Sequence, residues 1–504
     1  MASTYITVAI PYVNGAPHLG YAYELVLADI AARARRRLSG GRVRFLGGTD
    51  DHSLKNVLAA EAAGLDTREL VAANAGRFVE LAGRLEVGFD DFLHTSDDPR
   101  HAPAVRRLWE AAGGSGSLYR GTYRGRYCVG CEQFLTPAEL VEGQCPEHAT
   151  TPEMVEEENW FFRLTAYQDR LEDLLSSGRL TVTPEPFRHE VLAFVRSGLS
   201  DISVSRSVAR ARGWGVRVPG DPTQVVYVWF DALANYISAL GYGTGDSAYD
   251  RWWRRSERIH VIGKGILRFH AVYWPAFLLA AGEPLPDRIH VHPYLTADGA
   301  KLSKSSDAGG ADPLAVIDRF GIDALRWWFA RQVHANADTD FTAASLVAGA
   351  NGDLASGIAN VVSRIAALVH RYRGGATPDR TQPALPGVVV RCTEATAAFA
   401  DLDPRLGTQL VLDAVAVLNR DLESTAPWRV ARQPGAVLDP LLATYWRSAV
   451  ILAEAVEPVV PDLAGRLKHL LGHDALTLPA PVAAFPRLQS APTFLRSCAL
   501  RPRG

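Results

Sequence analysis

Three cysteines and one histidine have the spacing of a metal site. Cys128 and Cys131 form a CxxC pair, and after thirteen intervening residues Cys145 and His148 form a CxxH pair. Four nitrogen and sulfur ligands suit tetrahedral zinc, and because all four positions are filled none is left for a reactive water. We therefore predict a structural Zn²⁺ that holds a small subdomain with little core of its own. The alternative is a set of free thiols beside a chance histidine.

His18 lies where a nucleotide phosphate could bind. It belongs to the segment PHLGY, between the apolar run TYITVAI and a stretch with helical spacing. A helix that begins after a strand presents free N–H groups and a positive dipole end to anions. We expect His18 to donate to a phosphoryl oxygen, and Gly20 to allow close approach of the nucleotide. The alternative is a surface histidine in a turn.

Two lysines flanked by serines form a second candidate phosphate site. The segment KLSKS contains Lys301, Ser303 and Lys304 and follows TADG. On a loop after a strand, two ammonium groups suit a mobile clamp over a triphosphate, because each is a compact point charge on a flexible stem. The alternative is a solvated basic loop. The two motifs occur in one chain in this order, and together they favour a nucleotide-binding enzyme.

Hydrophobic periodicity indicates the elements that must position these residues. Residues 4–10 are short, β-branched and apolar, which predicts a buried strand; residues 19–37 have helical spacing, and VRFLGGTDDH predicts a second strand. Strand, helix and strand in this order predict a parallel βαβ unit. GGSG at 113–116 marks a hinge, strand patterns return at VVYVWF and IHVIGKG, and the chain after residue 341 reads as an α-helical bundle.

The composition is that of a multidomain globular protein. The chain has 504 residues, which predicts roughly three domains. A net charge of −2 argues against coating nucleic acid through bulk charge, although a local basic face could still dock one RNA. Five cysteines do not suggest a disulfide framework. Without a long apolar run or a secretory start, we predict a cytoplasmic protein with no membrane partner.

HLGY followed by KLSKS resembles the HIGH and KMSKS signatures of class I aminoacyl-tRNA synthetases. Further segments narrow the resemblance to methionyl-tRNA synthetases of the one-knuckle zinc type: AIPYVNGAPHLG, FLGGTDDH, GLSDISVSR, YVWFDALANYIS, RFHAVYWPAF, GIANVVSR and STAPW. The resemblance covers nearly the whole chain. It implies an α/β, Rossmann-type catalytic domain at 1–115 and 227–295, split by a connective insertion with a zinc knuckle at 116–226. A KMSKS-loop linker domain at 296–340, an α-helical anticodon-binding domain at 341–478 and a loosely packed Pro-rich tail at 479–504 would follow.

The resemblance also implies an activity, that of a methionine–tRNA ligase. Methionine would attack ATP bound with Mg²⁺ to give an adenylate, and the aminoacyl group would pass to methionine tRNA. The catalytic residues would be His18, Lys301 and Lys304. The ATP-binding residues would be His18, Gly20, Tyr21, Lys264, Lys301, Ser303 and Lys304. Because the chain stops soon after the bundle, we expect a monomer.

The methionine pocket can be carried over by position. Methionine is apolar and soft, so its thioether favours aromatic neighbours. By resemblance the pocket is lined by Ile10, Tyr12, Trp229, Ala232, Leu233, Tyr236, Phe269 and His270. Asp50 would pair with the substrate ammonium group. The alternative for Trp229, Leu233 and Tyr236, which have core-helix spacing, is ordinary packing.

Three residues of the bundle resemble the anticodon readers of this family. Asn360 and Arg364 are four residues apart, so they share one face of a helix, and Trp428 lies in the later segment APW. By resemblance Trp428 stacks on a base while Asn360 and Arg364 bind base edges, which is how single-stranded loops are recognised. The alternative is a helix cap and a surface arginine.

Five departures from the family pattern cluster near the nucleotide. Tyr21 replaces the second histidine of HIGH, Ser53 replaces a glycine, Gly265 an aspartate and Pro293 a glycine, and SSDAGGADP continues the lysine loop. They leave three hypotheses. The chain is a tRNA ligase with an altered nucleotide site, a paralogous ligase that passes the aminoacyl group to a small-molecule acceptor, or a non-catalytic RNA-binding relative.

Overall fold

The computed structural model describes residues 3–128, 133–135, 140–146, 149–297, 300–301, 312–433 and 437–489. The chain forms two compact units that interleave along the sequence. The first comprises Met1–Pro17, Ser39–Glu80 and Gly88–His292, and the second comprises His18–Leu38, Leu81–Val87 and Pro293–Gly504. Each unit therefore gathers segments that lie far apart in the sequence.

A six-stranded parallel sheet is the centre of the first unit. Its order is β3 (Asp91–His94), β2 (Val43–Thr49), β1 (Thr4–Val8), β12 (Glu257–Gly263), β13 (Arg288–His292) and β7 (Thr181–Thr183). All of β1 is buried, as expected for a central strand of a parallel sheet. Ile6 pairs with Phe45 on one side and with Ile259 on the other. The α/β class predicted from the sequence is confirmed.

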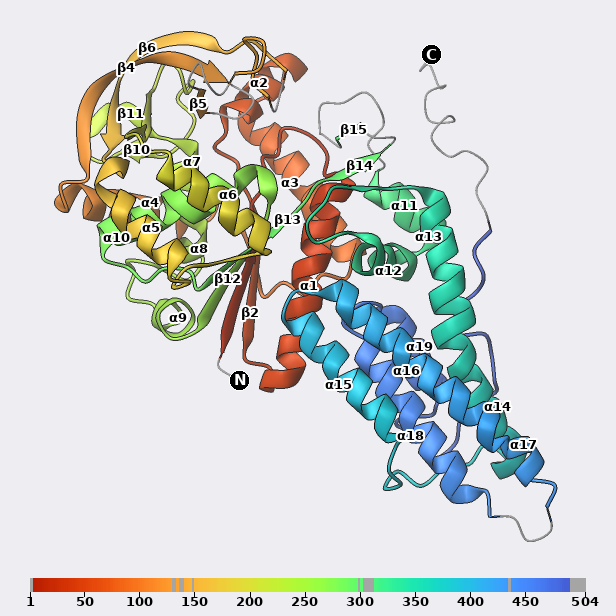
Figure 1. Ribbon diagram of the computed structural model, residues 1–504. Coiled ribbons are helices and arrows are strands. Elements are labelled where there is room, and N and C mark those ends of the chain that lie inside the picture. Colours follow the sequence, from red (N-terminus) through yellow and green to blue (C-terminus); the bar gives the residue numbers. More distant parts are fainter. Residues whose placement is uncertain are drawn as a thin grey trace, which may run out of the picture. The chain divides into compact units, whose positions relative to one another are not determined.

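The segment predicted as a connective insertion forms mainly antiparallel sheet. β4 (Leu118–Cys128) and β6 (Glu153–Phe162) pair along their whole length as a long ribbon, orange in Figure 1. β5 (Gln133–Leu135) and β8 (Ile202–Ser203) extend this sheet at its two edges. β7 comes from the same segment of sequence, yet it pairs with β13 at the edge of the parallel sheet. The segment 116–226 therefore also completes the central sheet.

Helices and short strands connect these sheets. They are α2 (Leu54–Ala63), α3 (Thr67–Arg84), α4 (His101–Gly114), η2 (Leu164–Tyr167), α5 (Gln168–Ser176), α6 (Glu185–Arg196), β9 (Ser205–Ser207), β10 (Arg217–Val218), β11 (Asp221–Val226), α7 (Val228–Leu233), α8 (Asn235–Ser238), α9 (Ser247–Tyr249), η3 (Asp250–Arg254), η4 (Lys264–Ile266), η5 (Phe269–Tyr273) and α10 (Trp274–Ala281). Two details differ from the sequence prediction. VVYVWF is not one strand, because β11 ends at Val226 and α7 begins at Val228. The predicted hinge begins inside α4, and the chain turns at Gly116 with φ of 75°.

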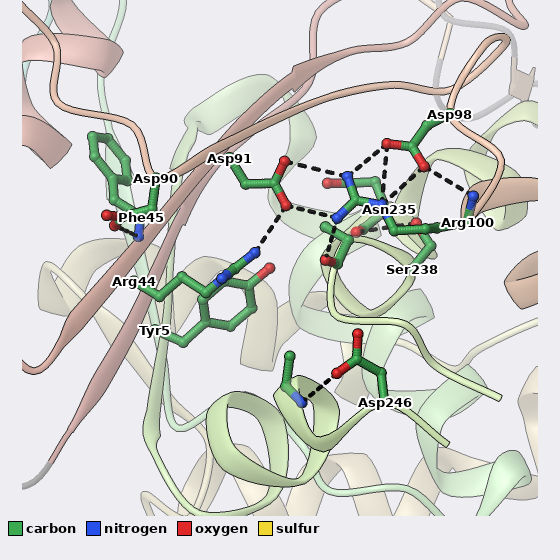
Figure 2. A network of polar contacts seen from close by, with 12 residues as sticks. Tyr5, Arg44, Phe45, Asp90, Asp91, Asp98, Arg100, Asn235, Ser238 and Asp246 are labelled. Carbon is green, nitrogen blue, oxygen red and sulfur yellow. Dashed lines mark hydrogen bonds and ion pairs between the residues drawn. The ribbon is translucent and has the colours of Figure 1, made fainter. Parts of the chain in front are cut away.

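Charged side chains join two strands and two loops of the first unit (Figure 2). Asp91 on β3 accepts hydrogen bonds from Arg44 Nη2 at 2.9 Å and from Arg100 Nη1 at 2.8 Å. Arg100 also donates to Asp98 Oδ2 at 2.6 Å and to the carbonyl of Ala239 at 2.8 Å. Because Ala239 directly follows α8, this network fixes the end of a helix that carries a predicted pocket residue.

The second unit is mainly helical. Its elements are α1 (Leu19–Ser39), β14 (Leu295–Ala297), β15 (Ala300–Lys301), α11 (Pro313–Phe320), α12 (Ile322–Gln332), β16 (Thr339–Asp340), α13 (Ala343–Gly349), η6 (Ala350–Ala359), α14 (Asn360–Arg373), α15 (Pro386–Ala400), α16 (Pro404–Thr425), α17 (Pro427–Val430), α18 (Asp439–Val456) and α19 (Pro461–Leu470). Among the described α-helices from α11 to α19, five begin with proline, where its fixed φ and missing N–H do no harm. α15 packs on α16 and α18, and α18 packs on α14 and α19. The predicted α-helical bundle is confirmed.

Two features of the second unit qualify expectations from the sequence. Among the described residues, the continuous helix Ala343–Arg373 is long and apolar enough to cross a membrane by length and composition, with a mean hydropathy of 1.2. Val361, Val362 and Ile365 of α14 are buried and α14 packs on α18, so the bundle covers part of the apolar face of this helix. In residues 479–489, Phe485 is buried and Asn351 bonds to both backbone groups of Leu488, while most of the other residues are exposed. Residues 490–504 lie outside the described residues.

Candidate functional site

Aromatic side chains from several elements of the first unit meet one another. Trp229 on α7 stacks on Phe269 of η5, with ring centroids 3.6 Å apart and planes inclined by 9°. Tyr12, in the loop after β1, meets the edge of Trp229 at 6.3 Å. Tyr236 Oη on α8 lies 2.7 Å from His270 Nε2. The structure thus brings together five of the residues predicted to line the amino-acid pocket.

The other predicted lining residues are close by in the fold. Ala232 and Leu233 are buried on α7, one helical turn from Trp229. Ile10 follows β1, and its Cγ2 lies 2.9 Å from the position that a Cβ on Gly48 would take. Glycine at position 48 therefore lets β2 approach the loop that carries Ile10.

Asp50 lies at the end of β2, beside the aromatic residues. It forms a bridge with Tyr12, and its N–H donates to the carbonyl of Pro11 at 2.9 Å. Its exposed fraction is 1%. Because β1, β2 and β12 are parallel, their carboxyl ends share one edge of the sheet, which is where open α/β sheets bind ligands. A buried carboxylate at this edge suits a substrate cation.

The proton on His270 can be assigned from its partners. His270 Nδ1 lies 3.0 Å from the carbonyl oxygen of Ile266, which only accepts, so Nδ1 carries the proton. Nε2 then accepts a hydrogen bond from the hydroxyl of Tyr236. Burial lowers the pKa of His270 to about 4. Near neutral pH the pair is therefore uncharged, which suits an apolar thioether.

Tyr236 is itself held from the central sheet. Tyr5 on β1 donates from its hydroxyl to the carbonyl of Tyr236 at 2.9 Å. The ring of Tyr236 also stacks on His260 of β12, with centroids 4.2 Å apart. Two central strands therefore set the position of this side chain.

Sequence reasoning missed three residues that contact one another, of which His52 also donates from its backbone N–H to Asp50. His52 and His101 both bond to the carboxylate of Asp231 on α7. His52 and Asp231 lie in two of the segments that carried the family resemblance, GTDDH and WFDAL, which was the available signal. His101 had none, because it lies in an unremarkable helical stretch.

His18 directly precedes α1 in the second unit and caps it. Its Nδ1 accepts a hydrogen bond from the backbone N–H of Tyr21 at 3.3 Å, which leaves the proton on Nε2 as a donor. A Cβ on Gly20 would lie 3.0 Å from two atoms of this ring, so the glycine makes room for the imidazole. Leu19 is buried at the start of the helix. An imidazole at the N-terminus of a helix is a group that suits an anion site.

The predicted phosphate-binding lysines are placed only in part. Lys264 lies in the first unit, half-buried in η4 directly after β12. Lys301 lies in β15 of the second unit, where its backbone pairs with Thr296 of β14. Ser303 and Lys304 lie outside the described residues, so the lysine clamp stays a prediction.

The predicted anticodon readers lie in the bundle. Asn360 is exposed at the start of α14, and Arg364 follows one turn later. Asn360 is not a helix cap, because η6 runs directly into α14. Arg364 Nη1 donates to Asn419 Oδ1 on α16 at 2.9 Å. Trp428 is half-buried in α17. Ala426, the residue before this helix, has a left-handed backbone with φ of 42°.

Two of the four predicted zinc ligands can be described. Cys128, at the end of β4, and Cys145 are each 1% exposed and belong to one small buried cluster with Leu140. Cys145 N–H donates to the carbonyl of Thr150 at 2.9 Å, which closes the loop around this thiol. Cys131 and His148 lie outside the described residues. The structure therefore places two of the four predicted ligands close together in a buried cluster, and the zinc site stays a prediction.

Comparisons with known proteins agree with this geometry. The family described as tRNA synthetases class I (M) matches residues 4–150 and 148–366. The methionine–tRNA ligase of Brucella suis is 36% identical over 97% of this chain and 98% of its own length. That of Mycobacterium leprae is also 36% identical, over 97% and 96%. The chain belongs to the methionyl-tRNA synthetases. The structure of Mycobacterium tuberculosis methionyl-tRNA synthetase in complex with methionyl-adenylate matches with a TM-score of 0.89 and 34% identity, covering 97% of this chain and 100% of that one.

Two departures from the pattern of methionyl-tRNA synthetases have a structural reason. Ser53 caps α2, because its Oγ accepts from the N–H of Lys55 at 3.1 Å. Tyr21 is 6% exposed, and burial raises its pKa well above the usual value, so its hydroxyl keeps its proton. Position 21 therefore offers no cation. Gly265 is exposed in η4, and nothing in the described residues explains the loss of an aspartate there.

Proposed function

We propose that the chain activates methionine with ATP and Mg²⁺ and transfers it to methionine tRNA. The observation that carries the proposal is the uncharged aromatic group around Trp229 and Phe269, set beside the buried carboxylate of Asp50. This combination matches a substrate with an apolar thioether at one end and an ammonium group at the other. The names of the relatives support the same substrate.

Methionine would be held at both ends. Asp50 would neutralise its ammonium group, and the thioether would lie among the aromatic rings. The full proposed set is Ile10, Tyr12, Asp50, Trp229, Ala232, Leu233, Tyr236, Phe269 and His270. Fixing both ends orients the carboxylate for attack, which converts a bimolecular step into an effectively intramolecular one.

In the first step a carboxylate oxygen of methionine attacks the α-phosphorus of ATP, and pyrophosphate leaves. No covalent enzyme intermediate is needed, so the protein contributes alignment and charge stabilisation. His18 would donate from Nε2 to a phosphoryl oxygen, and Lys301 and Lys304 would neutralise the phosphate charge. Gly20, Tyr21, Lys264 and Ser303 complete the proposed ATP site. In the second step a ribose hydroxyl of the tRNA attacks the adenylate carbonyl, and AMP leaves.

The remaining proposals concern partners and metal. Asn360, Arg364 and Trp428 would bind the anticodon of methionine tRNA. Cys128, Cys131, Cys145 and His148 would hold one zinc ion, which stabilises the tip of the connective segment. We place the chain in the cytoplasm, where tRNA is charged, and expect a monomer. The relatives give no support to the alternative of a small-molecule acceptor.

Pyrophosphate exchange with a panel of amino acids, with and without tRNA, tests the proposal. We expect exchange that depends on methionine and not on tRNA, and charging of methionine tRNA by the same preparation. Asp50→Ala should abolish exchange, while Asp287→Asn, which weakens an ion pair with Arg258 elsewhere in the first unit, should not. Exchange with another amino acid but not methionine would refute the substrate. Exchange without tRNA charging would refute the acceptor.

A further inference from the structure

Asp231 lies buried between two histidines in the first unit. Its Oδ2 is 2.6 Å from His52 Nδ1, and its Oδ1 is 2.9 Å from His101 Nε2. The side chains of Asp231 and His101 are 1% and 0% exposed, and that of His52 is 11% exposed. His101 Nδ1 lies 2.9 Å from Ser238 Oγ, so the chain of contacts continues into α8.

These contacts are hydrogen bonds rather than a metal site. Two ligands of a tetrahedral zinc lie roughly 3.3 Å apart, because each ligand bond is about 2.0 Å long. The Asp231–His52 distance of 2.6 Å is too short for that arrangement and is typical of a charge-assisted hydrogen bond. Both imidazoles therefore donate to the carboxylate, each from the nitrogen that faces it.

The network ends at Asp50. The backbone N–H of His52 donates to Asp50 Oδ1 at 3.2 Å, and Asn56 Nδ2 donates to the carbonyl of Asp50 at 3.1 Å. At its other end, Asp231 lies on α7, two residues after Trp229 and next to Ala232. A single carboxylate thus joins the loop that carries Asp50 to the helix that carries the aromatic residues.

We propose that Asp231 and His52 form a positioning pair for the amino-acid substrate, which holds the ammonium-binding carboxylate of Asp50 at a fixed distance from the aromatic wall of α7. This inference rests on the proposed function. Methionine must reach both Asp50 and the aromatic wall. If the contacts that support Asp50 are lost, the carboxylate moves and methionine binds more weakly.

The charges around the pair favour the ionised form. Burial alone would lower the pKa of His52, but the charge and hydrogen bond of Asp231, together with Asp51, outweigh it, so the pKa of His52 is raised. Arg68 opposes this rise. Burial alone would raise the pKa of Asp231, yet the two histidines hold it well below its usual range. Both shifts favour the form in which a protonated His52 faces an ionised Asp231, and a hydrogen bond between ions is stronger than a neutral one.

Two amide substitutions at position 52 distinguish positioning from mere packing. The amide nitrogen of asparagine is as many bonds from Cα as His Nδ1, so His52→Asn keeps a donor facing Asp231. In glutamine the nitrogen is one bond further out, so His52→Gln displaces it. Glu283→Gln is the control, because Glu283 accepts from Tyr249 at 2.8 Å in the same unit, and neither residue belongs to the proposed pocket.

The KM for methionine and the KM for ATP are measured by pyrophosphate exchange. We expect His52→Gln and Asp231→Asn each to raise the KM for methionine about tenfold or more and to leave the KM for ATP within about twofold. His52→Asn should stay within about threefold of the unsubstituted protein, and Glu283→Gln should be unchanged. The double variant His52→Gln with Asp231→Asn should be no worse than Asp231→Asn alone, since that substitution already disturbs the contact with His52.

Three results would overturn the inference. They are an unchanged KM for methionine in both His52→Gln and Asp231→Asn, equal rises in the KM for methionine and for ATP, and additive effects in the double variant. If His52→Gln does not fold, the KM for methionine is compared between Asp231→Asn, which disturbs the pair, and His52→Asn, which keeps a donor facing Asp231. Methionine-dependent exchange by the unsubstituted protein tests the proposed function separately, so either idea can fail alone.

Discussion

The indole of Trp229 lies parallel to the phenyl ring of Phe269, with centroids 3.6 Å apart. Tyr12 and His270 meet the same indole edge-on, at 6.3 Å and 6.4 Å. Trp229 is thus the common neighbour of three other predicted pocket residues. Its loss should remove more binding surface than the loss of any one of them.

Trp229→Ala should raise the KM for methionine about a hundredfold in pyrophosphate exchange, because truncating an aromatic anchor of a binding site costs about 2–4 kcal/mol of binding. Trp229→Phe keeps a ring and should lose much less. The KM for ATP serves as the control and should stay nearly constant. An Ala variant that folds and retains its KM for methionine would place the substrate elsewhere.

Asn419 hydrogen-bonds to Arg364. We therefore predict that Asn419 positions Arg364 for the anticodon without binding a base itself. Asn419→Ala leaves the guanidinium without its 2.9 Å partner and should raise the KM for tRNA about threefold to tenfold, the usual net worth of one hydrogen bond. Pyrophosphate exchange should not change. Arg391→Ala, which removes an exposed ion pair with Glu394 in the same bundle, is the matched control.

The cycle of Arg364→Ala and Asn419→Ala tests the argument further. If Asn419 acts through Arg364, the double variant should bind tRNA no worse than Arg364→Ala alone. Fully additive losses would mean that Asn419 contacts the RNA independently.

Removal of zinc should destabilise the connective segment. The protein should contain one zinc ion per chain, and a strong chelator should lower the melting temperature, since metal binding and folding of such a knuckle are coupled. Cys145→Ser should lower the zinc content, whereas Cys392→Ser, which changes a buried cysteine on α15, should not. Protein prepared without chelator and free of zinc would refute the site.

The sequence predicted local elements better than their pairing. The β-branched run of β1 and the helical spacing of α1 gave both elements to within a few residues, because each pattern is set by local periodicity. The prediction of a strand over VVYVWF was wrong in its second half, because Val228 begins a helix. Periodicity alone cannot tell a strand from a helix in so short an apolar run. His52 and His101 meet Asp231 from 179 and 130 residues away, and only the order of the sheet brings them together.

Arg326 should be essential for the stability of the second unit. Its side chain and that of Asp29 are 0% exposed, and its nitrogens donate to Asp29 Oδ2 and to the carbonyls of Leu85, Pro458 and Val459. Arg326→Met should reduce the free energy of unfolding by about 3–5 kcal/mol, because it leaves a buried carboxylate with less compensation. Denaturant titration measures this loss.

A second variant checks that reason. Asp29 also pairs with Arg33 at 2.7 Å. The double variant Arg326→Met with Asp29→Asn should therefore lose less than the sum of the single losses, since it removes the buried charge. Full additivity would show that packing, and not the ion pair, accounts for the effect.

The ion pair between His52 and Asp231 should give stability a definite pH dependence. The pKa of His52 is raised, so its contribution is complete below the unfolded value near 6.5 and is lost as pH rises through the folded pKa. The pKa of Asp231 is lowered, so its contribution is present above the unfolded value near 3.8 and is lost as pH falls toward the folded pKa. The difference in unfolding free energy between the protein and Asp231→Asn should thus be largest between these two unfolded values and shrink on either side. Urea titrations across this range measure it, and a difference that does not vary with pH would mean that the pair is not ionised in the folded protein.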